Sequence, residues 1–472
     1  MGSESRRSRG LRALAAALAV ALASGCAANR PREEPAPTPA RTTPREPVAT
    51  RPPAPPASLP QGVPGGGPPA PPPVSDEWRT RSTVRIGLKV GAPELLLAGS
   101  SAWKLETLDG NELAHAVPGE MLRIRQKNGS IDVTKRDGGD ALASTDPDDT
   151  LLLVPERGYC GWSGRWYRGT FRVYATPAGA DGASNGLTLV NEAPLEDYLR
   201  GVLPEEIGNP PATDFEAVKA QAVAARTYTL SYLGRRADLG FDLWATVEDQ
   251  VYGGTARENA QGSRAVEETR GEILLSDGVP IRALYSSACG GRTSNVEDVW
   301  PWPWTPYLRS VRDAEDDNLT GYCSLSANYR WREEWPVDQF VATLRKYAPA
   351  EGASVAALDG QLLDVRIEQR SRSGRVALLV VETTEGDCVV HGDRTRWALR
   401  RPGTEAILRS SFFKIGIQRA ADGAPLKVVA SGGGNGHGIG MCQWGAMGMA
   451  RAGKNYREIL RHYYKDTQLA HL

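Results

Sequence analysis

An alanine-rich segment in the middle of the chain constrains the fold more than any other feature. It begins with Thr213-Asp-Phe-Glu216, a capping-box sequence that marks the start of a helix, and it runs to about Leu233. Its small residues recur along the helix at Ala217, Ala220, Ala222, Ala224 and Ala225. Small side chains let neighbouring elements approach closely, so we predict that this helix is central and buried.

A second helix is predicted immediately before it. Pro194 stands where proline is tolerated at the start of a helix. The apolar residues that follow are spaced for one helical face: Leu195, Tyr198, Leu199 and Val202. Pro204 is expected to end this helix, because proline lacks an N–H group and its ring clashes with the preceding turn.

Most of the remaining ordered sequence is typical of short strands. Alternating or β-branched runs, separated by Gly, Asp and Asn, recur between residues 82 and 190, and strands resume after the central helix. Residues 331–347 and 456–464 are predicted to be helical. No regular βαβ alternation occurs, so the expected fold class is α+β. We expect a β-rich region over residues 81–185 and a mixed helix and strand domain over residues 186–467.

The first 25 residues have the parts of a signal peptide: an arginine-rich start, an apolar run and small residues before Cys26. The apolar run is too short for a membrane-spanning helix. Ser24-Gly25-Cys26 is similar to a bacterial lipobox, although the usual leucine is displaced by one position, to Leu22. We therefore expect cleavage before Cys26 and acylation of its thiol. Ordinary secretion with cleavage nearby is the alternative.

Residues 26–80 are expected to form a disordered tether, because their Pro-rich composition cannot bury a core. The chain has 56 basic and 56 acidic residues, so it has no basic excess to drive nucleic-acid binding. The signal peptide and the lipobox-like cysteine predict that the protein is located in the cell envelope, outside the cytoplasm and lipid-anchored. In a cell with two membranes this would be the periplasmic face of the outer membrane.

Six cysteines occur, and one of them is the expected lipid anchor. In an oxidising compartment we favour a disulfide between Cys289 and Cys323, the closest pair in sequence, with Cys388 and Cys442 as a weaker second pair. The sequence contains no Cys-x-x-Cys pair and no Cys/His set at zinc spacing. We therefore expect no metal site and no cofactor.

The first segment that could carry chemistry is Gly201-Val-Leu-Pro-Glu-Glu-Ile207, which lies between the two predicted helices. A carboxylate held beside apolar groups has a raised pKa and can act as a general acid near neutral pH. Glu205 and Glu206 are the candidates for this role. The alternative is that both are solvated loop residues.

Two glycine-rich segments are further candidates. One contains Ser286, Ser287 and Cys289 before a Gly-Gly turn, and a proline-stiffened aromatic run then begins at Trp300. Aromatic rings on such a loop can stack on the apolar faces of sugars; core packing is the alternative. The other segment surrounds His437 with glycines, but its spacing does not match a nucleotide-binding loop. A cysteine peptidase using Cys289 and His437 stays open, as does a binding module without chemistry.

Together these blocks closely resemble the SpoIID/LytB family, which comprises stage II sporulation protein D and the amidase-enhancer proteins. The longest block runs from Val190 to Ile207, and the most specific is Lys219-Ala-Gln-Ala-Val-Ala-Ala-Arg-Thr-Tyr228. The others follow in the family's order, as Asp249-Gln-Val-Tyr-Gly253, Ser286-Ser-Ala-Cys-Gly-Gly-Arg-Thr293 and Gly436-His-Gly-Ile-Gly-Met-Cys-Gln-Trp-Gly-Ala446. The resemblance extends over roughly residues 185–465.

The resemblance implies a peptidoglycan lytic transglycosylase, which cuts between N-acetylmuramic acid and N-acetylglucosamine and leaves 1,6-anhydro ends. It places the catalytic glutamate at Glu206 rather than Glu205, although Ile207 and Gly208 stand where Met and Pro are typical. The residues expected to hold the glycan are Gln221, Arg226, Ser286, Ser287, Arg292, Trp300 and His437. For Gln221 and Arg226, a buried structural role is the alternative.

The family also includes amidase enhancers, so a non-catalytic, peptidoglycan-binding enhancer is the runner-up function. Some members look able to bind zinc through Cys and His. The matching histidine is absent here, with Ser286 and Ser287 standing nearby, so zinc is not carried over. The expected partners are peptidoglycan strands, a membrane through Cys26 and, for an enhancer, a cell-wall amidase. The family name refers to sporulation, whereas the tether and lipobox do not suggest a sporulation-specific setting.

Overall fold

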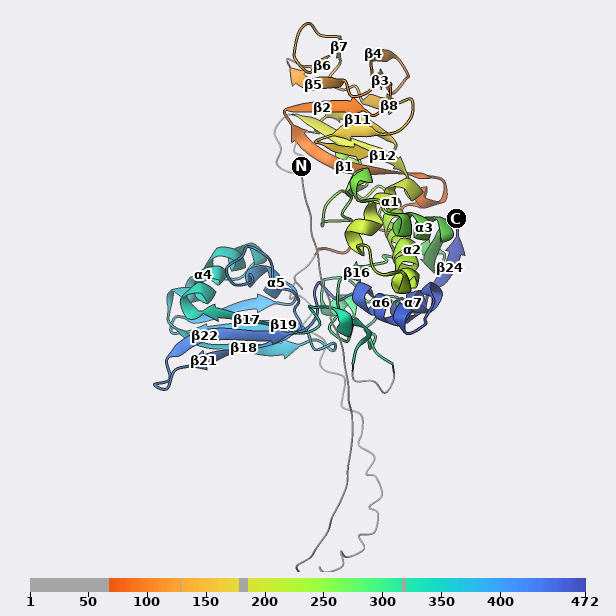
Figure 1. Cartoon of the computed structure of the whole chain (residues 1–472). Coiled ribbons are helices and arrows are strands. Elements are labelled where there is room, and N and C mark those ends of the chain that lie inside the picture. The colour runs from red at the N-terminus through yellow and green to blue at the C-terminus, as the bar shows by residue number, and fades with distance from the viewer. Residues whose placement is uncertain (1–67, 128, 178–185, 316–319) are drawn as a thin grey trace, which may run out of the picture. The chain divides into compact units, whose positions relative to one another are not determined.

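A computed structural model of the chain describes residues 68–127, 129–177, 186–315 and 320–472. The expected signal peptide, the anchor Cys26 and the first part of the expected tether, residues 26–67, lie outside the described residues. The last part, residues 68–80, differs from the prediction of disorder, because it contains the 3-10 helix Asp76–Arg79 and its Trp78 is buried in the core. Within these described ranges, no helix has the length and apolar character needed to cross a membrane. Helices and several separate sheets occur without a repeating βαβ order, which confirms the α+β prediction (Figure 1).

The N-terminal part of the described chain is built from two mainly antiparallel sheets whose inner side chains share one hydrophobic core. The sheet orders are β13-β1-β12-β11-β8-β3-β4 and β10-β9-β2-β5-β6-β7. The strands are β1 (Thr83–Ala92), β2 (Glu94–Gly99), β3 (Trp103–Thr107), β4 (Glu112–Ala116), β5 (Met121–Lys127), β6 (Ser130–Lys135), β7 (Ala143–Thr145), β8 (Leu151–Pro155), β9 (Cys160–Trp162), β10 (Arg165–Tyr167), β11 (Thr170–Ala175), β12 (Leu187–Pro194) and β13 (Leu243–Trp244). β12 passes directly into the first helix, so this core continues into the helical part.

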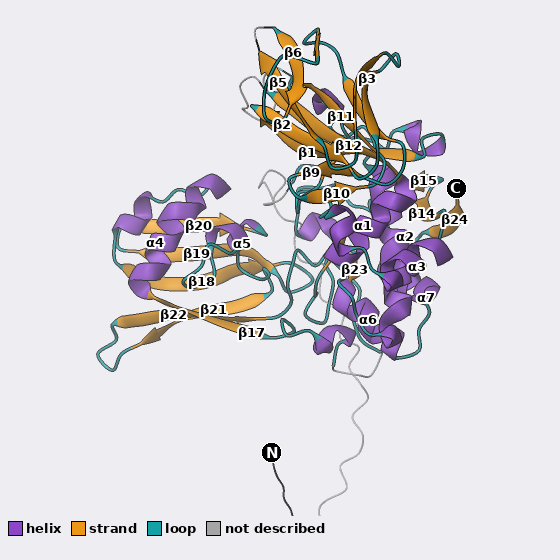
Figure 2. Ribbon diagram, turned by 45° about the horizontal axis from the view of Figure 1, so that its top comes forward, coloured by secondary structure: helices purple, strands orange, loops and turns teal. Residues whose placement is uncertain are grey.

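The helical part surrounds one buried helix, α2 (Phe215–Ser231), whose residues from 220 to 231 are all buried. α2 packs against four other helices and against β14, as Figure 2 lets the reader follow. These partners are α1 (Leu195–Glu206), α3 (Ala260–Glu268), α6 (Gln443–Arg451), α7 (Tyr456–Tyr463) and β14 (Glu272–Ser276). The alanine pattern therefore predicted the central helix correctly.

The start of α2 differs from the prediction. Thr213 belongs to a short 3-10 helix, Ala212–Asp214, and Asp214 precedes α2 without a side-chain capping bond. Glu216 instead accepts a hydrogen bond at 2.8 Å from the backbone N–H of Tyr456. The predicted capping box is thus wrong, because a distant segment provides the partner for Glu216.

Two small sheets join segments that are far apart in sequence. β14 lies between β15 (Val279–Pro280) and β24 (Gln468–His471). β16 (Tyr285–Ser286) pairs in parallel with β23 (Met441–Cys442). This second pair places the residues before the Gly-Gly turn beside the start of α6.

Residues between 331 and 430 form a second hydrophobic core. Two three-stranded sheets, β17-β22-β21 and β18-β19-β20, and two helices contribute to it. Their bounds are β17 (Trp331–Pro336), α4 (Val337–Tyr347), β18 (Leu362–Arg370), β19 (Val376–Thr383), β20 (Gly386–His391), α5 (Arg394–Ala398), β21 (Phe413–Arg419) and β22 (Pro425–Gly432).

The prediction of one helix over residues 331–347 is wrong in its first six residues. Trp331 and Trp335 are both buried on β17, which pairs with β22. A spacing of four residues puts two side chains on one face of a helix, and it does the same on a strand. Pro336 then separates the strand from α4.

Candidate active site

Glu206 is the last residue of α1, and its position depends on the buried face of that helix. Leu199, Val202 and Leu203 are fully buried. Pro204 lies inside the last turn, and the Ile207 N–H bonds to the Leu203 carbonyl at 2.9 Å. The expectation that Pro204 ends the helix is therefore wrong by two residues, since the helix tolerates the missing N–H in its last turn.

Glu206 is a half-buried residue, and its carboxyl group lies largely within the protein. Its Oε1 accepts a hydrogen bond from the Val251 N–H at 3.0 Å. Burial raises the pKa of Glu206 to about 7, and the charge of Glu205 adds to this rise, while the Val251 N–H opposes it. A carboxyl group with this pKa is protonated in a large fraction of molecules at neutral pH, so it can donate a proton.

The neighbouring Glu205 lies in a different environment. Its Oε1 is 3.4 Å from Nε of the exposed Arg257, and the side chain is partly open to solvent. Surface ion pairs of this kind contribute little energy. Both glutamates are half-buried, and they differ in their partners: Glu206 contacts the Val251 N–H, whereas Glu205 lies beside the exposed Arg257.

The Val251 N–H is held in place by its neighbour Gln250, which is fully buried. Gln250 Oε1 accepts hydrogen bonds from the Tyr198 hydroxyl at 3.2 Å and the Thr229 hydroxyl at 2.7 Å. Its Nε2 donates to the Tyr285 hydroxyl oxygen at 3.0 Å. Since both ends of the amide are bound, the segment that contacts Glu206 has little freedom to move.

Asp249 fixes the same segment from the other side. Its carboxylate lies 2.7 Å from Arg235 and 3.1 Å from Arg236, and it accepts the Trp244 N–H at 2.8 Å. Tyr252 then donates its hydroxyl proton to Asn191 Oδ1 at 3.0 Å. Each residue of the Asp249–Tyr252 motif thus makes a hydrogen bond, either to Glu206 itself or to a neighbouring protein group.

Gln443 completes the surroundings of Glu206. It is the first residue of α6, and its Nε2 donates to the Glu206 carbonyl oxygen at 3.0 Å and to Gln221 Oε1 at 3.3 Å. Gln221 is fully buried, and its Nε2 has no hydrogen-bond partner in the described part of the chain. The structure therefore joins the predicted residues Glu206 and Gln221 through a third residue that the sequence analysis did not single out.

Arg226 is a structural residue in this arrangement. Its guanidinium is completely buried and makes a bidentate pair with Glu196, at 2.9 and 2.6 Å. It also donates to the carbonyl oxygens of Val266 and Glu272. With its donors directed at protein groups, Arg226 fits the alternative of a buried structural role.

The predicted residues near the Gly-Gly turn lie beside the start of α6. Ser286 is buried on β16 opposite Cys442, and the Ser287 carbonyl accepts the Trp444 N–H at 3.0 Å. Arg292 is exposed, and its backbone bridges to Arg312. No hydrogen bond joins any of these three side chains to Glu206 in the described residues.

His437 packs against Trp300, with ring centroids 4.8 Å apart. Its Nδ1 accepts the Ile439 N–H at 3.0 Å, so the proton sits on Nε2 and is donated to the Tyr285 carbonyl at 3.0 Å. Burial lowers the pKa of His437 to about 4, which keeps the imidazole neutral at pH 7. Both ring nitrogens are thus committed to the backbone.

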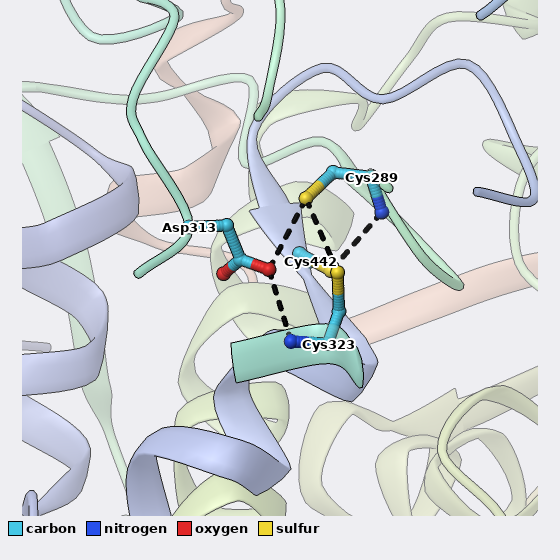
Figure 3. Close-up of side chains that lie close together, drawn as sticks. All are labelled: Cys289, Asp313, Cys323 and Cys442. Atoms are coloured by element: carbon cyan, nitrogen blue, oxygen red, sulfur yellow. Dashed lines mark hydrogen bonds between the residues drawn. The ribbon is translucent and has the colours of Figure 1, made fainter. Parts of the chain in front are cut away.

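The cysteine-peptidase alternative is contradicted by this geometry. Cys289 is fully buried, and its thiol contacts Asp313 and Cys323 rather than His437 (Figure 3). Burial raises the pKa of the Cys289 thiol, which disfavours the nucleophilic thiolate. Both ring nitrogens of His437 bond to backbone groups, so His437 is not placed to act as the base for this thiol.

The predicted disulfides are also corrected. The Sγ atoms of Cys289 and Cys323 are 3.7 Å apart and both thiols are free, whereas a disulfide needs about 2.05 Å. Cys388 lies in the second core, while Cys442 lies with Cys289 and Cys323. The cysteine spacing predicted no cluster of metal ligands, and the structure instead brings three cysteines and Asp313 together.

Comparisons with known proteins agree with this arrangement. Residues 183–275, which include Glu206, α2 and the Asp249–Tyr252 motif, match the family model described as stage II sporulation protein, SpoIID. Residues 323–440 match a family model described as a domain of unknown function. These residues include the second hydrophobic core.

Three relatives were compared over their aligned lengths. An uncharacterized protein of Brachyspira hyodysenteriae is 32% identical over 284 residues, which cover 60% of this chain and 68% of the relative. The amidase enhancer of Bacillus subtilis is 30% identical, covering 57% of this chain and 40% of the relative. Stage II sporulation protein D of Bacillus subtilis is 27% identical, covering 60% and 76%. By its motifs, its family model and these relatives, the chain belongs to the SpoIID family.

Proposed function

We propose that this protein is a peptidoglycan lytic transglycosylase with Glu206 as its single acid and base. The observation that carries the proposal is the half-buried Glu206 carboxyl group, whose pKa is raised by burial to about 7. It lies at the end of a rigid helix and contacts an ordered backbone N–H. A group that must first donate and then accept a proton works best when its pKa is near the working pH.

The proposed reaction needs no second protein carboxylate. Protonated Glu206 gives its proton to the glycosidic oxygen as the bond from C1 of N-acetylmuramic acid breaks, and N-acetylglucosamine leaves as an alcohol. The resulting carboxylate takes the proton from the muramic-acid 6-hydroxyl as that oxygen bonds to C1. The product is a 1,6-anhydro end, and Glu206 regains its proton.

An ordinary glycosidase would use a second carboxylate as nucleophile or base. The neighbouring Glu205 is directed at Arg257 at the surface. In the proposed reaction the substrate's own 6-hydroxyl replaces the nucleophile, and its N-acetyl group stabilises the positive charge that develops at C1.

Three predicted substrate residues keep exposed surface and remain proposals for glycan binding. Ser287 and Trp300 are half-buried and Arg292 is exposed. Trp300 is the proposed stacking surface, since its ring packs against His437 and Trp302 while part of the side chain stays exposed. Ser286, Gln221, Arg226 and His437 are buried or fully committed to protein groups, and we assign them to support of the site.

We also propose that the protein works in the cell envelope and is held there through an acylated Cys26. Peptidoglycan is a fixed meshwork, so an enzyme on a tether that ends before residue 68 gains by staying near it. A single acyl chain gives only weak membrane attachment, and firm anchoring requires more than one.

The pH dependence of the reaction follows from Glu206. Its raised pKa means that the proton donor is present below about pH 7 and is lost as the pH rises through that value. We expect kcat/KM for glycan cleavage to fall by about tenfold for each pH unit above about pH 7.5. Initial rates between pH 5 and pH 9 check this, and a rate that rises through neutral pH would contradict the assignment.

An amidase enhancer is the second candidate function, because a relative aligned over 298 residues carries that name. Product analysis separates the two functions. The full-length protein is incubated with intact and with peptide-stripped glycan strands, and the ends are identified by mass spectrometry. We expect 1,6-anhydro ends. If neither substrate yields any, and the protein instead accelerates a cell-wall amidase, the enhancer function is correct.

A further inference from the structure

Four buried side chains from separate segments point toward one another in the structure (Figure 3). Cys289 follows β16, Asp313 lies in the next long connection, Cys323 lies in a 3-10 turn, and Cys442 precedes α6. One donor atom from each lies within 4.8 Å of every other donor, and all four residues are completely buried. The proposed glycan cleavage uses none of them.

The spacing of these donors fits one tetrahedral metal ion. Zinc–thiolate bonds of ~2.3 Å place two sulfur ligands of a tetrahedron ~3.8 Å apart. The Cys289 and Cys323 sulfurs are 3.7 Å apart. Asp313 Oδ2 lies 3.2 Å from Cys289 Sγ, which agrees with a shorter metal–oxygen bond on a third vertex. We propose that Cys289, Asp313, Cys323 and Cys442 bind one Zn²⁺ ion.

Backbone N–H groups around the cluster are directed at its sulfur atoms. Cys442 Sγ accepts the N–H groups of Cys289 at 3.2 Å and of Gly445 at 3.3 Å, and Cys289 Sγ accepts the Gly291 N–H at 3.4 Å. Such bonds stabilise thiolate charge and orient the ligands of metal sites. Cys442 also caps the N-terminus of α6, where the helix dipole favours negative charge.

Asp313 is oriented in the same manner. Its Oδ2 accepts the Cys323 N–H at 3.1 Å, and its Oδ1 accepts the hydroxyl proton of the buried Tyr463. A Cβ atom added at Gly445 would collide with both the Asp313 carboxylate and the Tyr463 hydroxyl. A glycine is therefore required for α6 to approach the carboxylate this closely.

A metal ion accounts for all four side chains, whereas a disulfide accounts for only two. Any pair of these cysteines that oxidised would leave the third thiol and Asp313 buried without a role. Three thiolates and a carboxylate leave a Zn²⁺ site with net negative charge, and the buried Arg375 lies beside it, donating to the Cys289 carbonyl at 3.1 Å. Binding displaces the thiol protons to solvent and involves no oxidation.

The proposed site is closed, because four protein donors surround it and none is exposed, so zinc has a structural role here. In the sequence, Cys323 precedes and Cys442 follows the second core, which spans residues 331–430. Gln443, the residue after Cys442, bonds to the Glu206 carbonyl. One ion would therefore hold together the two chain segments that lead into and out of the second core. It would also hold the start of α6 next to Glu206.

The test uses the full-length protein purified without chelator or reductant. Metal content is measured by inductively coupled plasma mass spectrometry, and alkylation of the denatured, chelator-treated chain maps free thiols. We expect about one zinc per chain, with Cys160, Cys289, Cys323, Cys388 and Cys442 all alkylated. Chelation should lower the Tm by at least about 5 °C, and added Zn²⁺ should restore it.

Matched variants locate the ion. Cys323→Ser should abolish bound zinc, while Cys388→Ser, which changes another buried cysteine in the second core, should retain it. If Cys323→Ser fails to fold, the metal content and the thiol map of the unmodified protein still decide whether these residues bind zinc. Zinc-free protein, a disulfide among the three cysteines or stoichiometric iron would overturn the proposal. These readouts do not depend on glycan cleavage, so the two proposals fail separately.

Discussion

Replacing Glu206 with Gln is expected to lower the production of 1,6-anhydro ends by at least about 100-fold while the protein stays folded. The amide keeps the shape of the carboxyl group and can still accept the Val251 N–H bond. It cannot give a proton to the glycosidic oxygen or take one from the 6-hydroxyl. The rate at saturating strand concentration measures the loss, and circular dichroism checks the fold.

Glu205→Gln is the matched control for this variant. The two residues are adjacent, but Glu205 is directed at Arg257 on the surface. We expect its substitution to change the rate by less than about threefold, because a surface ion pair contributes little. An equal loss in both variants, or full activity in Glu206→Gln, would remove Glu206 from the mechanism.

Arg226→Ala is expected to destabilise the fold by about 3–5 kcal/mol, because it removes one partner of a buried ion pair. The guanidinium is fully buried and both oxygens of Glu196 bond to it. Substitution would also leave the Val266 and Glu272 carbonyls without this donor. Denaturant unfolding followed by circular dichroism measures the change.

The control for Arg226→Ala is Arg264→Ala, which removes an exposed helical pair with Glu268. We expect less than about 1 kcal/mol there. At a temperature where Arg226→Ala is still folded, its KM for glycan strands should equal that of the unmodified protein. A raised KM with unchanged stability would return Arg226 to a substrate-binding role.

The parts of the fold that depend on local pattern could be predicted from the sequence. The alanine spacing predicted α2, and the alternating runs predicted some of the strands of the two N-terminal sheets. Errors arose where two patterns coincide: Trp331 and Trp335 are spaced for a helix but lie on one face of a strand. They also arose where a distant segment provided a partner, as Tyr456 did for Glu216.

The candidate site could be predicted only in part, for the same reason. The block around Glu206 identified the carboxyl group, but the N–H group that bonds to it comes from Val251, 45 residues away. Gln443 bonds to Glu206 across 237 residues. The cysteine pairing was chosen by closeness in sequence, and Cys442 joins Cys289 only through the pairing of β16 with β23. Such contacts follow from the tertiary fold and leave no local pattern.

The central claim is that one glutamate cleaves the glycan with the substrate's own hydroxyl as nucleophile. Cleavage of glycan strands in water enriched in ¹⁸O tests this claim directly, with the new muramic-acid ends analysed by mass spectrometry. The proposed mechanism predicts 1,6-anhydro ends that contain no ¹⁸O. Reducing ends that carry one ¹⁸O atom would show that water attacks C1, and this result would contradict the mechanism.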